Sequence, residues 1–298
     1  MRILRFPVFL WIMLSFCGLN DMNAQKTISD THQDLDFYKG MNLYSKQKYG
    51  AAQLQFQNVM EKYAGSHSEI AKTAAYYNAL CAVRLFNDDA EYLMYKYINQ
   101  YPESQKINEA YFELGKFAYD KKSWGTALKW FGKIDRYDLT KDQQGEYLFK
   151  KGYCHFMRNE LDEARIPLFE LKDSKQKYAL PATYYYAHIA YVQKNYETAL
   201  DNFLKLNDDA TFGPVVPYYV SQIYFLQEKW DKLLEYAPPM LATVTEKRYA
   251  EVSRMIGEAY FQTGQFDKAI PYLEKYHELT GNPSRKDNYQ TERTITLY

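Results

Sequence analysis

The stretch that decides the fold is GKFAYDKKSWGTALKWFGKI, residues 115–134. Within and just before it, apolar side chains recur at intervals of three and four residues on both sides of a short polar break, as on one face of an α-helix. The stripe before the break is Tyr111, Leu114 and Ala118, and the stripe after it is Ala127, Phe131 and Ile134. The break, Lys121-Lys122-Ser123, has the length of a turn. The stretch therefore predicts two helices joined by a tight turn.

The same pattern occurs seven times along the chain. Each copy starts at an anchor residue, usually small, and about a dozen positions later come alanine and then a large apolar residue. The anchors are Gly40, Asn78, Gly115, Gly152, Ala187, Ser221 and Gly257, separated by 38, 37, 37, 35, 34 and 36 residues. One helix pair cannot bury its apolar face alone, so seven copies in phase indicate that neighbouring pairs stack and share a core.

This pattern resembles the tetratricopeptide repeat, a helix–turn–helix unit of 34 residues. The family's small, tightly packed residue matches the glycine anchors, whereas Asn78 departs from it. The family's alanine at the helix crossing matches Ala52, Ala90, Ala127, Ala164, Ala199 and Ala269, and Leu233 stands in its place in the sixth copy. The resemblance implies an all-α fold, a right-handed superhelical solenoid of about seven helix–turn–helix repeats over residues 34–281.

The first 24 residues have the order of a signal peptide, with a positive start, an apolar run and a polar end. Arg2 and Arg5 precede an uncharged run over residues 6–19, which is too short to cross a bilayer core of about 30 Å. We therefore expect export, cleavage after Ala24 and a linker over residues 25–33, with no integral membrane segment left after cleavage. The expected location is periplasmic or outer-membrane-associated in a Gram-negative bacterium. An uncleaved anchor and a buried helix are the alternatives, and Phe16 before Cys17 argues against a lipoprotein cysteine.

Composition excludes several classes of function. Lys+Arg and Asp+Glu are both 37, so the formal net charge is zero, which argues against a nucleic-acid binder and against a polybasic membrane-surface protein. The sequence contains neither a phosphate-binding G-x-x-x-x-G-K-[ST] loop nor a G-x-S-x-G nucleophile elbow, and its five histidines have no paired metal-ligand spacing. We expect no catalysis, no cofactor and no metal. Cys81 and Cys154 are expected to be buried apolar residues rather than a disulfide.

Aromatic residues are abundant, with 31 Tyr and 17 Phe. In the tetratricopeptide family the first helix of each pair lines the concave face, and the resemblance implies the same here. The fourth residue after the anchor is aromatic in six of the seven copies. The predicted partner-binding groove comprises Tyr119, Phe149, Tyr153, Phe156, Tyr184, Tyr185, His188, Tyr191, Tyr218, Tyr219, Phe225 and Phe261. For any single member, packing between neighbouring helices is the alternative.

The sequence therefore favours a non-catalytic protein–protein interaction scaffold in the cell envelope that binds a peptide or a partner helix, because phenol rings combine contact area with a hydrogen-bonding tip. The alternative is a glycan or peptidoglycan-fragment binder that uses the same rings, with Glu113, Glu146 and Lys150 as polar neighbours. A carboxylate clamp of the kind used by chaperone-binding members is not expected, because Lys150 is the one cation among the inward positions of the fourth and fifth copies.

The last segment, residues 282–298, is interpreted as an incomplete eighth repeat or a tail. Solenoids normally end in a polar-faced capping helix, and no complete helix follows the seventh copy here. We therefore expect a partly exposed apolar end near residues 266–281 and end-to-end self-association through it. Truncation of a longer array is the alternative cause.

Overall fold

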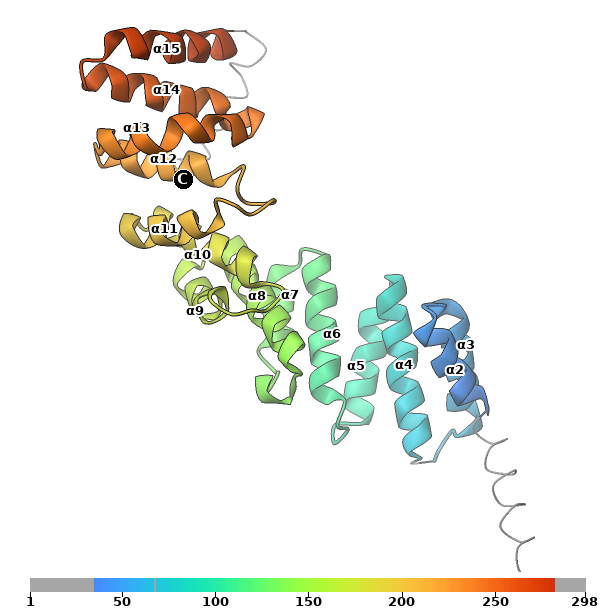
Figure 1. The fold of residues 1–298 in the computed structure, drawn as a ribbon. Helices are drawn as coiled ribbons and strands as arrows, with labels where there is room; N and C mark the ends of the chain where they lie inside the picture. Colours follow the sequence, from blue (N-terminus) through green and yellow to red (C-terminus); the bar gives the residue numbers. More distant parts are fainter. Residues whose placement is uncertain (1–34, 67, 282–298) are drawn as a thin grey trace, which may run out of the picture. The chain divides into compact units, whose positions relative to one another are not determined.

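The fold was examined in a computed structural model, which describes residues 35–66 and 68–281. The predicted signal peptide and linker, residues 1–33, and the predicted tail, residues 282–298, lie outside the described residues. The described residues contain fourteen α-helices and three short 3-10 helices, with no strand (Figure 1). The all-α prediction is confirmed.

The chain divides into two compact units at Lys121/Lys122, within the turn of the third repeat. The first unit holds α2 (Leu35–Ser45), α3 (Tyr49–Lys62), α4 (Glu69–Leu85), α5 (Ala90–Gln100) and α6 (Ile107–Asp120). The second holds α7 (Trp124–Phe131), α8 (Lys141–Met157), α9 (Leu161–Lys172), α10 (Ala179–Val192), α11 (Tyr196–Phe203), α12 (Val216–Leu226), α13 (Trp230–Met240), α14 (Glu246–Gln262) and α15 (Phe266–Thr280).

Glycine anchors set how closely the two helices of a repeat approach. A Cβ atom added to Gly40 would lie 2.7 Å from the Phe56 ring, and one added to Gly152 or Gly257 would lie 2.7 Å from Leu168 or Leu273. In each case the contact is sixteen residues later, on the second helix. The crossing alanines Ala52, Ala90, Ala127, Ala164, Ala199 and Ala269 are buried, as is Leu233 in the sixth repeat.

The turns within repeats share one backbone feature. Each contains a residue with positive φ: Gln47, Phe86, Lys122, Asn159, Lys194, Glu228 and Gly264. In six of these turns, for example Asn195 N–H to Ala190 O at 2.8 Å and Lys229 N–H to Tyr224 O at 2.9 Å, the next residue donates a hydrogen bond to the carbonyl five residues earlier. This is the Schellman ending of a helix, which usually carries glycine at the left-handed position.

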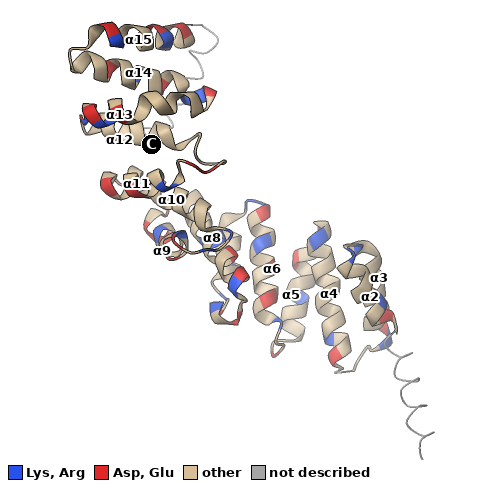
Figure 2. Ribbon diagram, in the orientation of Figure 1, with Lys and Arg blue, Asp and Glu red and all other residues tan. Residues whose placement is uncertain are grey.

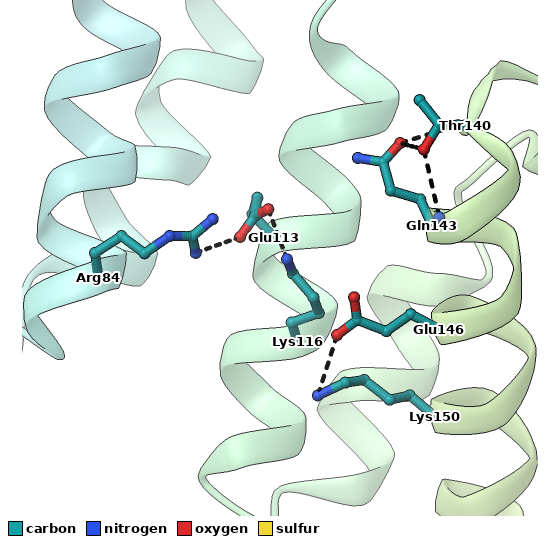
Figure 3. Close-up of polar contacts among 7 residues, drawn as sticks. All are labelled: Arg84, Glu113, Lys116, Thr140, Gln143, Glu146 and Lys150. Carbon is teal, nitrogen blue, oxygen red and sulfur yellow. Dashed lines mark hydrogen bonds and ion pairs between the residues drawn. The ribbon is translucent and has the colours of Figure 1, made fainter. Parts of the chain in front are cut away.

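Among its described residues the first unit contains one buried charged residue, and it is paired with two cations. Glu113, only 4% exposed, lies between Arg84 and Lys116, with nitrogen–oxygen distances of 2.6 and 2.7 Å (Figure 3). Burial alone would raise the pKa of the Glu113 carboxyl, but its hydrogen bond to Arg84 and the charge of Lys116 outweigh burial and lower the pKa. The carboxylate therefore stays charged and links α4 to α6.

In the second unit, the start of α8 is fixed by a capping box. Gln143 N–H donates to the Thr140 hydroxyl at 3.4 Å, and Thr140 N–H donates to the Gln143 side-chain oxygen at 2.9 Å (Figure 3). Both otherwise unpaired amides at the helix start are thereby satisfied. One turn later Glu146 faces Lys150 at 3.6 Å. Cys154 on the same helix is buried and free, as is Cys81 on α4.

Candidate partner-binding surface on helices α8, α10 and α12

Helices α10 and α12 contain no Lys, Arg, Asp or Glu, and Figure 2 draws them in tan. Their sequences, ALPATYYYAHIAYV and VPYYVSQIYFL, are instead rich in tyrosine. Each has a proline in its first turn, where a missing backbone N–H breaks no helical hydrogen bond. These two first helices of their repeats therefore present an uncharged, aromatic surface, unlike α8 and α14.

Nine of the predicted groove residues form one continuous set of ring contacts, which we call the aromatic cluster. Its members are Phe149, Tyr153 and Phe156 on α8, Tyr184, Tyr185, His188 and Tyr191 on α10, and Tyr218 and Tyr219 on α12.

Tyr185 lies at the centre of the α8 side of the cluster. Its ring centroid is 5.0 Å from that of Tyr153 and 5.1 Å from that of Phe156. The Tyr153 contact is edge-to-face, a favourable geometry for aromatic pairs.

Tyr219 plays the same part on the α12 side. Its ring stacks on Phe203 with centroids 5.0 Å apart, and it contacts His188 and Tyr191 edge-on, each at 5.4 Å. Tyr184 stacks on Phe212 at 4.9 Å. The α10 residues therefore connect the two sides.

Burial separates the cluster into two kinds of residue. Phe149, Tyr218 and Tyr219 are 8%, 4% and 9% exposed, so they belong mainly to the core. Packing between helices, the alternative weighed for each residue, accounts for these three. The other six members are partly exposed and have ring surface available to a partner.

Three predicted groove residues lie apart from the cluster. Phe225 packs edge-on against Trp230 at 5.4 Å, and Phe261 packs against Phe266 at 5.2 Å near the last described turn. Tyr119 is on α6 and belongs to the first unit. The candidate surface is therefore the cluster on α8, α10 and α12, within the second unit.

The cluster is uncharged at neutral pH. Burial raises the pKa of Tyr184, Tyr185 and Tyr191, so all three keep their protons. Burial, aided by the positive charge of Arg248, lowers the pKa of His188 to about 4. His188 is therefore neutral, and its Nδ1 atom is buried without a hydrogen-bond partner among the described residues.

One charged residue beside the cluster, Arg248, is not among the predicted groove residues. It lies in the first turn of α14, and its guanidinium carbon is 4.1 Å from the centroid of the Tyr218 ring. The first predicted groove residue of a copy, such as Phe149, Tyr184 or Tyr218, lies three residues before its anchor, whereas Arg248 lies nine before Gly257. Extending the same stripe by two helical turns toward the helix start would have found it.

Among the described residues no group of three or more His, Cys, Asp and Glu side chains could hold a metal ion.

Comparisons with known proteins agree on the fold. A crystal structure of MamA matches with a TM-score of 0.50 and 18% identity, over 62% of this chain and 97% of MamA. The apo form of RapI matches with a TM-score of 0.50 and 15% identity, over 83% of this chain and 97% of RapI. Together with the seven in-phase helix pairs, these likenesses decide the assignment. The chain has a tetratricopeptide-type repeat fold.

A tetratricopeptide repeat protein from Parabacteroides merdae also matches, but at a TM-score of 0.49 and 12% identity the likeness is too weak to add to the assignment. No protein-family model matches the sequence, and no curated protein matches it either. The comparisons therefore show the fold alone. Among the described residues, no helix has the length and apolar character needed to cross a membrane.

Proposed function

We propose that this tetratricopeptide-type protein is a non-catalytic scaffold that binds an extended peptide or a helix of a protein partner over the aromatic cluster. One observation carries the proposal: six partly exposed rings, Tyr153, Phe156, Tyr184, Tyr185, His188 and Tyr191, gather on two neighbouring first helices, one of which has no charged residue. Large rings with few rotatable bonds bind partners at a low entropic cost, and depletion of charge is typical of the centre of protein interfaces.

The glycan alternative is less well supported by the same surface. Sugar sites usually combine an open ring face with adjacent acidic, amide or arginine side chains. Here Tyr185 and Tyr219 meet several other rings of the cluster. Two of the polar groups expected to assist, Glu146 and Lys150, face one another, and Glu113 belongs to the first unit and is held by Arg84 and Lys116. The geometry therefore favours a protein partner.

The proposed setting is the cell envelope, and it rests on the order of residues 1–24 alone. The chain carrying a C-terminal tag should be recovered from the periplasmic or membrane fraction of expressing cells, with a processed N-terminus by mass spectrometry. Recovery of the unprocessed chain from the cytosolic fraction would refute this part of the proposal.

Site-specific photo-crosslinking tests the surface itself. A benzophenone amino acid placed at Tyr185 should capture a discrete protein from an envelope extract, whereas the same group at Tyr137, an exposed residue of the same unit outside the cluster, should not. Equal capture from both positions, or from neither, would contradict the proposal. Binding of the protein to a glycan array in the absence of any captured protein would favour the alternative.

A further inference from the structure

Arg248 is distinguished from the other described arginines because it is partly buried and yet has no ionic partner among the described residues. Arg84, Arg136, Arg158 and Arg254 each contact a carboxylate, of Glu113, Glu170, Glu160 and Glu258 respectively. Arg165 is exposed on α9. Arg248 alone is partly buried and forms no ion pair among the described residues.

The neighbouring carboxylate is already engaged. Glu251, one turn further along α14, lies 3.3 Å from the Nε atom of Arg254. Arg248 instead has the face of Tyr218 beneath its guanidinium group at 4.1 Å. Stacking on an aromatic ring leaves the outer N–H groups of a guanidinium available, and their fork matches the two oxygens of a carboxylate.

The surroundings increase the effect of this one charge. Arg248 lies near enough to affect the pKa of Tyr184, His188, Tyr191 and Tyr218, all members of the aromatic cluster. The two helices that carry these residues have no charged side chain of either sign. Because Arg248 is partly buried beside these uncharged helices, the attraction between its guanidinium group and an incoming anion is stronger than at an ordinary solvated surface.

A second polar group beside the cation is also unsatisfied. The Nδ1 atom of His188 is buried and lacks a hydrogen-bond partner among the described residues. Tyr191, in contrast, is committed, because its hydroxyl donates to the Gln222 side-chain oxygen at 2.7 Å. Buried polar atoms are normally hydrogen-bonded, and the His188 Nδ1 atom is one of the exceptions among the described residues.

From these contacts we infer that Arg248, stacked on Tyr218, and the neighbouring rings of the aromatic cluster form a recognition site for an acidic side chain, Asp or Glu, of the bound protein segment. The rings hold an apolar residue next to that acid, and the Arg248 guanidinium forms a bidentate pair with its carboxylate. This inference rests on the proposed function and specifies the chemistry of the partner.

Selection from random peptides tests it without knowledge of the natural partner. Two libraries are displayed on phage, one joined through the C-terminus of the peptide and one with a free C-terminus, and each is selected on the purified chain. The first library should be enriched in sequences that pair Asp or Glu with an apolar neighbour. Enrichment confined to the library with free C-termini would assign Arg248 to a terminal carboxylate and overturn the inference.

The best peptide and its Asp→Asn or Glu→Gln counterpart are then compared by fluorescence anisotropy. On the unaltered chain the loss of the acid should weaken binding about tenfold or more, which corresponds to about 1.4 kcal/mol. On Arg248→Gln the two peptides should bind alike, and Arg248→Lys should restore part of the preference because it keeps the charge. Arg165→Gln, which removes an exposed arginine elsewhere, should behave as the unaltered chain.

The outcomes separate this inference from the proposed function. Peptides that bind without any acidic preference, or with a preference that Arg248→Gln leaves intact, would overturn the inference and preserve the scaffold. Failure to select any peptide would overturn both. Circular dichroism melts of each variant show whether the fold is retained. If the protein binds uronic-acid glycans and no peptide, Arg248 recognises a sugar carboxylate, which would refute the inference and favour the glycan alternative.

Discussion

At the residue scale, the glycine anchors give the most specific prediction of stability. Gly152 faces Leu168 Cγ, so an added methyl group would meet the branch point of that side chain at 2.7 Å and the ring of Pro167 at 3.2 Å. Neither neighbour is a flexible chain end. Gly152→Ala should therefore lower the free energy of unfolding by about 1–3 kcal/mol.

The matched control for this substitution is Gly50→Ala on α3, where no atom lies within 4 Å of the added Cβ. Because alanine favours helix over glycine, the control should leave stability unchanged or raise it by up to about 1 kcal/mol. Urea unfolding followed by circular dichroism measures both. A Gly152→Ala chain as stable as the control would show that the helix crossing is looser than the contacts indicate.

Glu113 gives a prediction of pH dependence at the same scale. Its folded-state pKa lies below the ordinary value of 4.5, so its pairs with Arg84 and Lys116 stabilise the fold above about pH 4.5. That contribution is lost as the pH falls through the lowered folded-state pKa. Glu113→Gln should cost about 2–4 kcal/mol at pH 7, since two partly buried cations lose their counter-charge.

Unfolding measurements from pH 7 down to pH 3 test this expectation. The difference between the original chain and Glu113→Gln should shrink as the acid is titrated. Replacement of the exposed Glu61 on α3 should change stability by no more than about 0.5 kcal/mol at neutral pH. A difference for Glu113→Gln that stays constant with pH would point to the shape of the side chain rather than its charge.

At the element scale, the turns within repeats retain local strain. Six of the seven positive-φ residues are not glycine, although a left-handed conformation costs an ordinary residue roughly 1 kcal/mol or more. Glu228, at φ 54°, ends α12 in this way and is exposed. Glu228→Gly should therefore raise the free energy of unfolding by about 0.5–1 kcal/mol, because relief of strain outweighs the added freedom of the unfolded chain.

Glu235→Gly, at an exposed position inside α13, provides the opposite case. There the backbone is helical and glycine should destabilise by about 1 kcal/mol. Chemical unfolding of the two variants and the original chain measures both changes in the free energy of unfolding, one expected to be an increase and the other a decrease. Destabilisation by both substitutions would mean that the Glu228 side chain contributes more than its backbone strain costs.

The same scale shows what a single sequence can predict. Helix pairing and the buried crossing alanines follow from local spacing, since three- and four-residue periods and small anchors are written within each copy. The exposure of an aromatic residue cannot be predicted from this local spacing. Tyr185 and Tyr219 occupy similar stretches of neighbouring first helices, yet Tyr219 is buried because Phe203, from the preceding helix, stacks on it.

Arg248 shows the same limit from the other direction. Its place beside the cluster depends on how α14 packs against α12, and the carboxylate of Glu251, one turn further along, lies 3.3 Å from Arg254. Contacts between residues far apart in the sequence cannot be predicted from the spacing of apolar residues. The lack of an ion pair at Arg248 is therefore seen only in three dimensions, whereas the position of Arg248 on its helix and the tyrosines around it follow from spacing.

At the scale of the whole molecule, each helix pair leaves an apolar face that the next pair covers. Within the second unit this holds from α8 to α14, whose buried residues form continuous clusters. The last described helix, α15, differs, because Ala269 is its one buried residue. Phe266 and Ile270 are 55% and 51% exposed, and Phe261 from the end of α14 adjoins Phe266. An apolar patch thus lies at the end of the described repeats.

We expect this patch to drive self-association of the purified chain. Sedimentation velocity over a hundredfold range of concentration should show a monomer that converts to larger species as concentration rises. Ile270→Lys should shift that conversion to higher concentration, because it places a charge in the centre of the patch without disturbing a buried contact. Ile166→Lys, at an exposed position on α9 outside the patch, is the matched control and should leave the association unchanged. A chain that stays monomeric throughout, or an equal response to both substitutions, would show that the patch is not where copies of the protein meet.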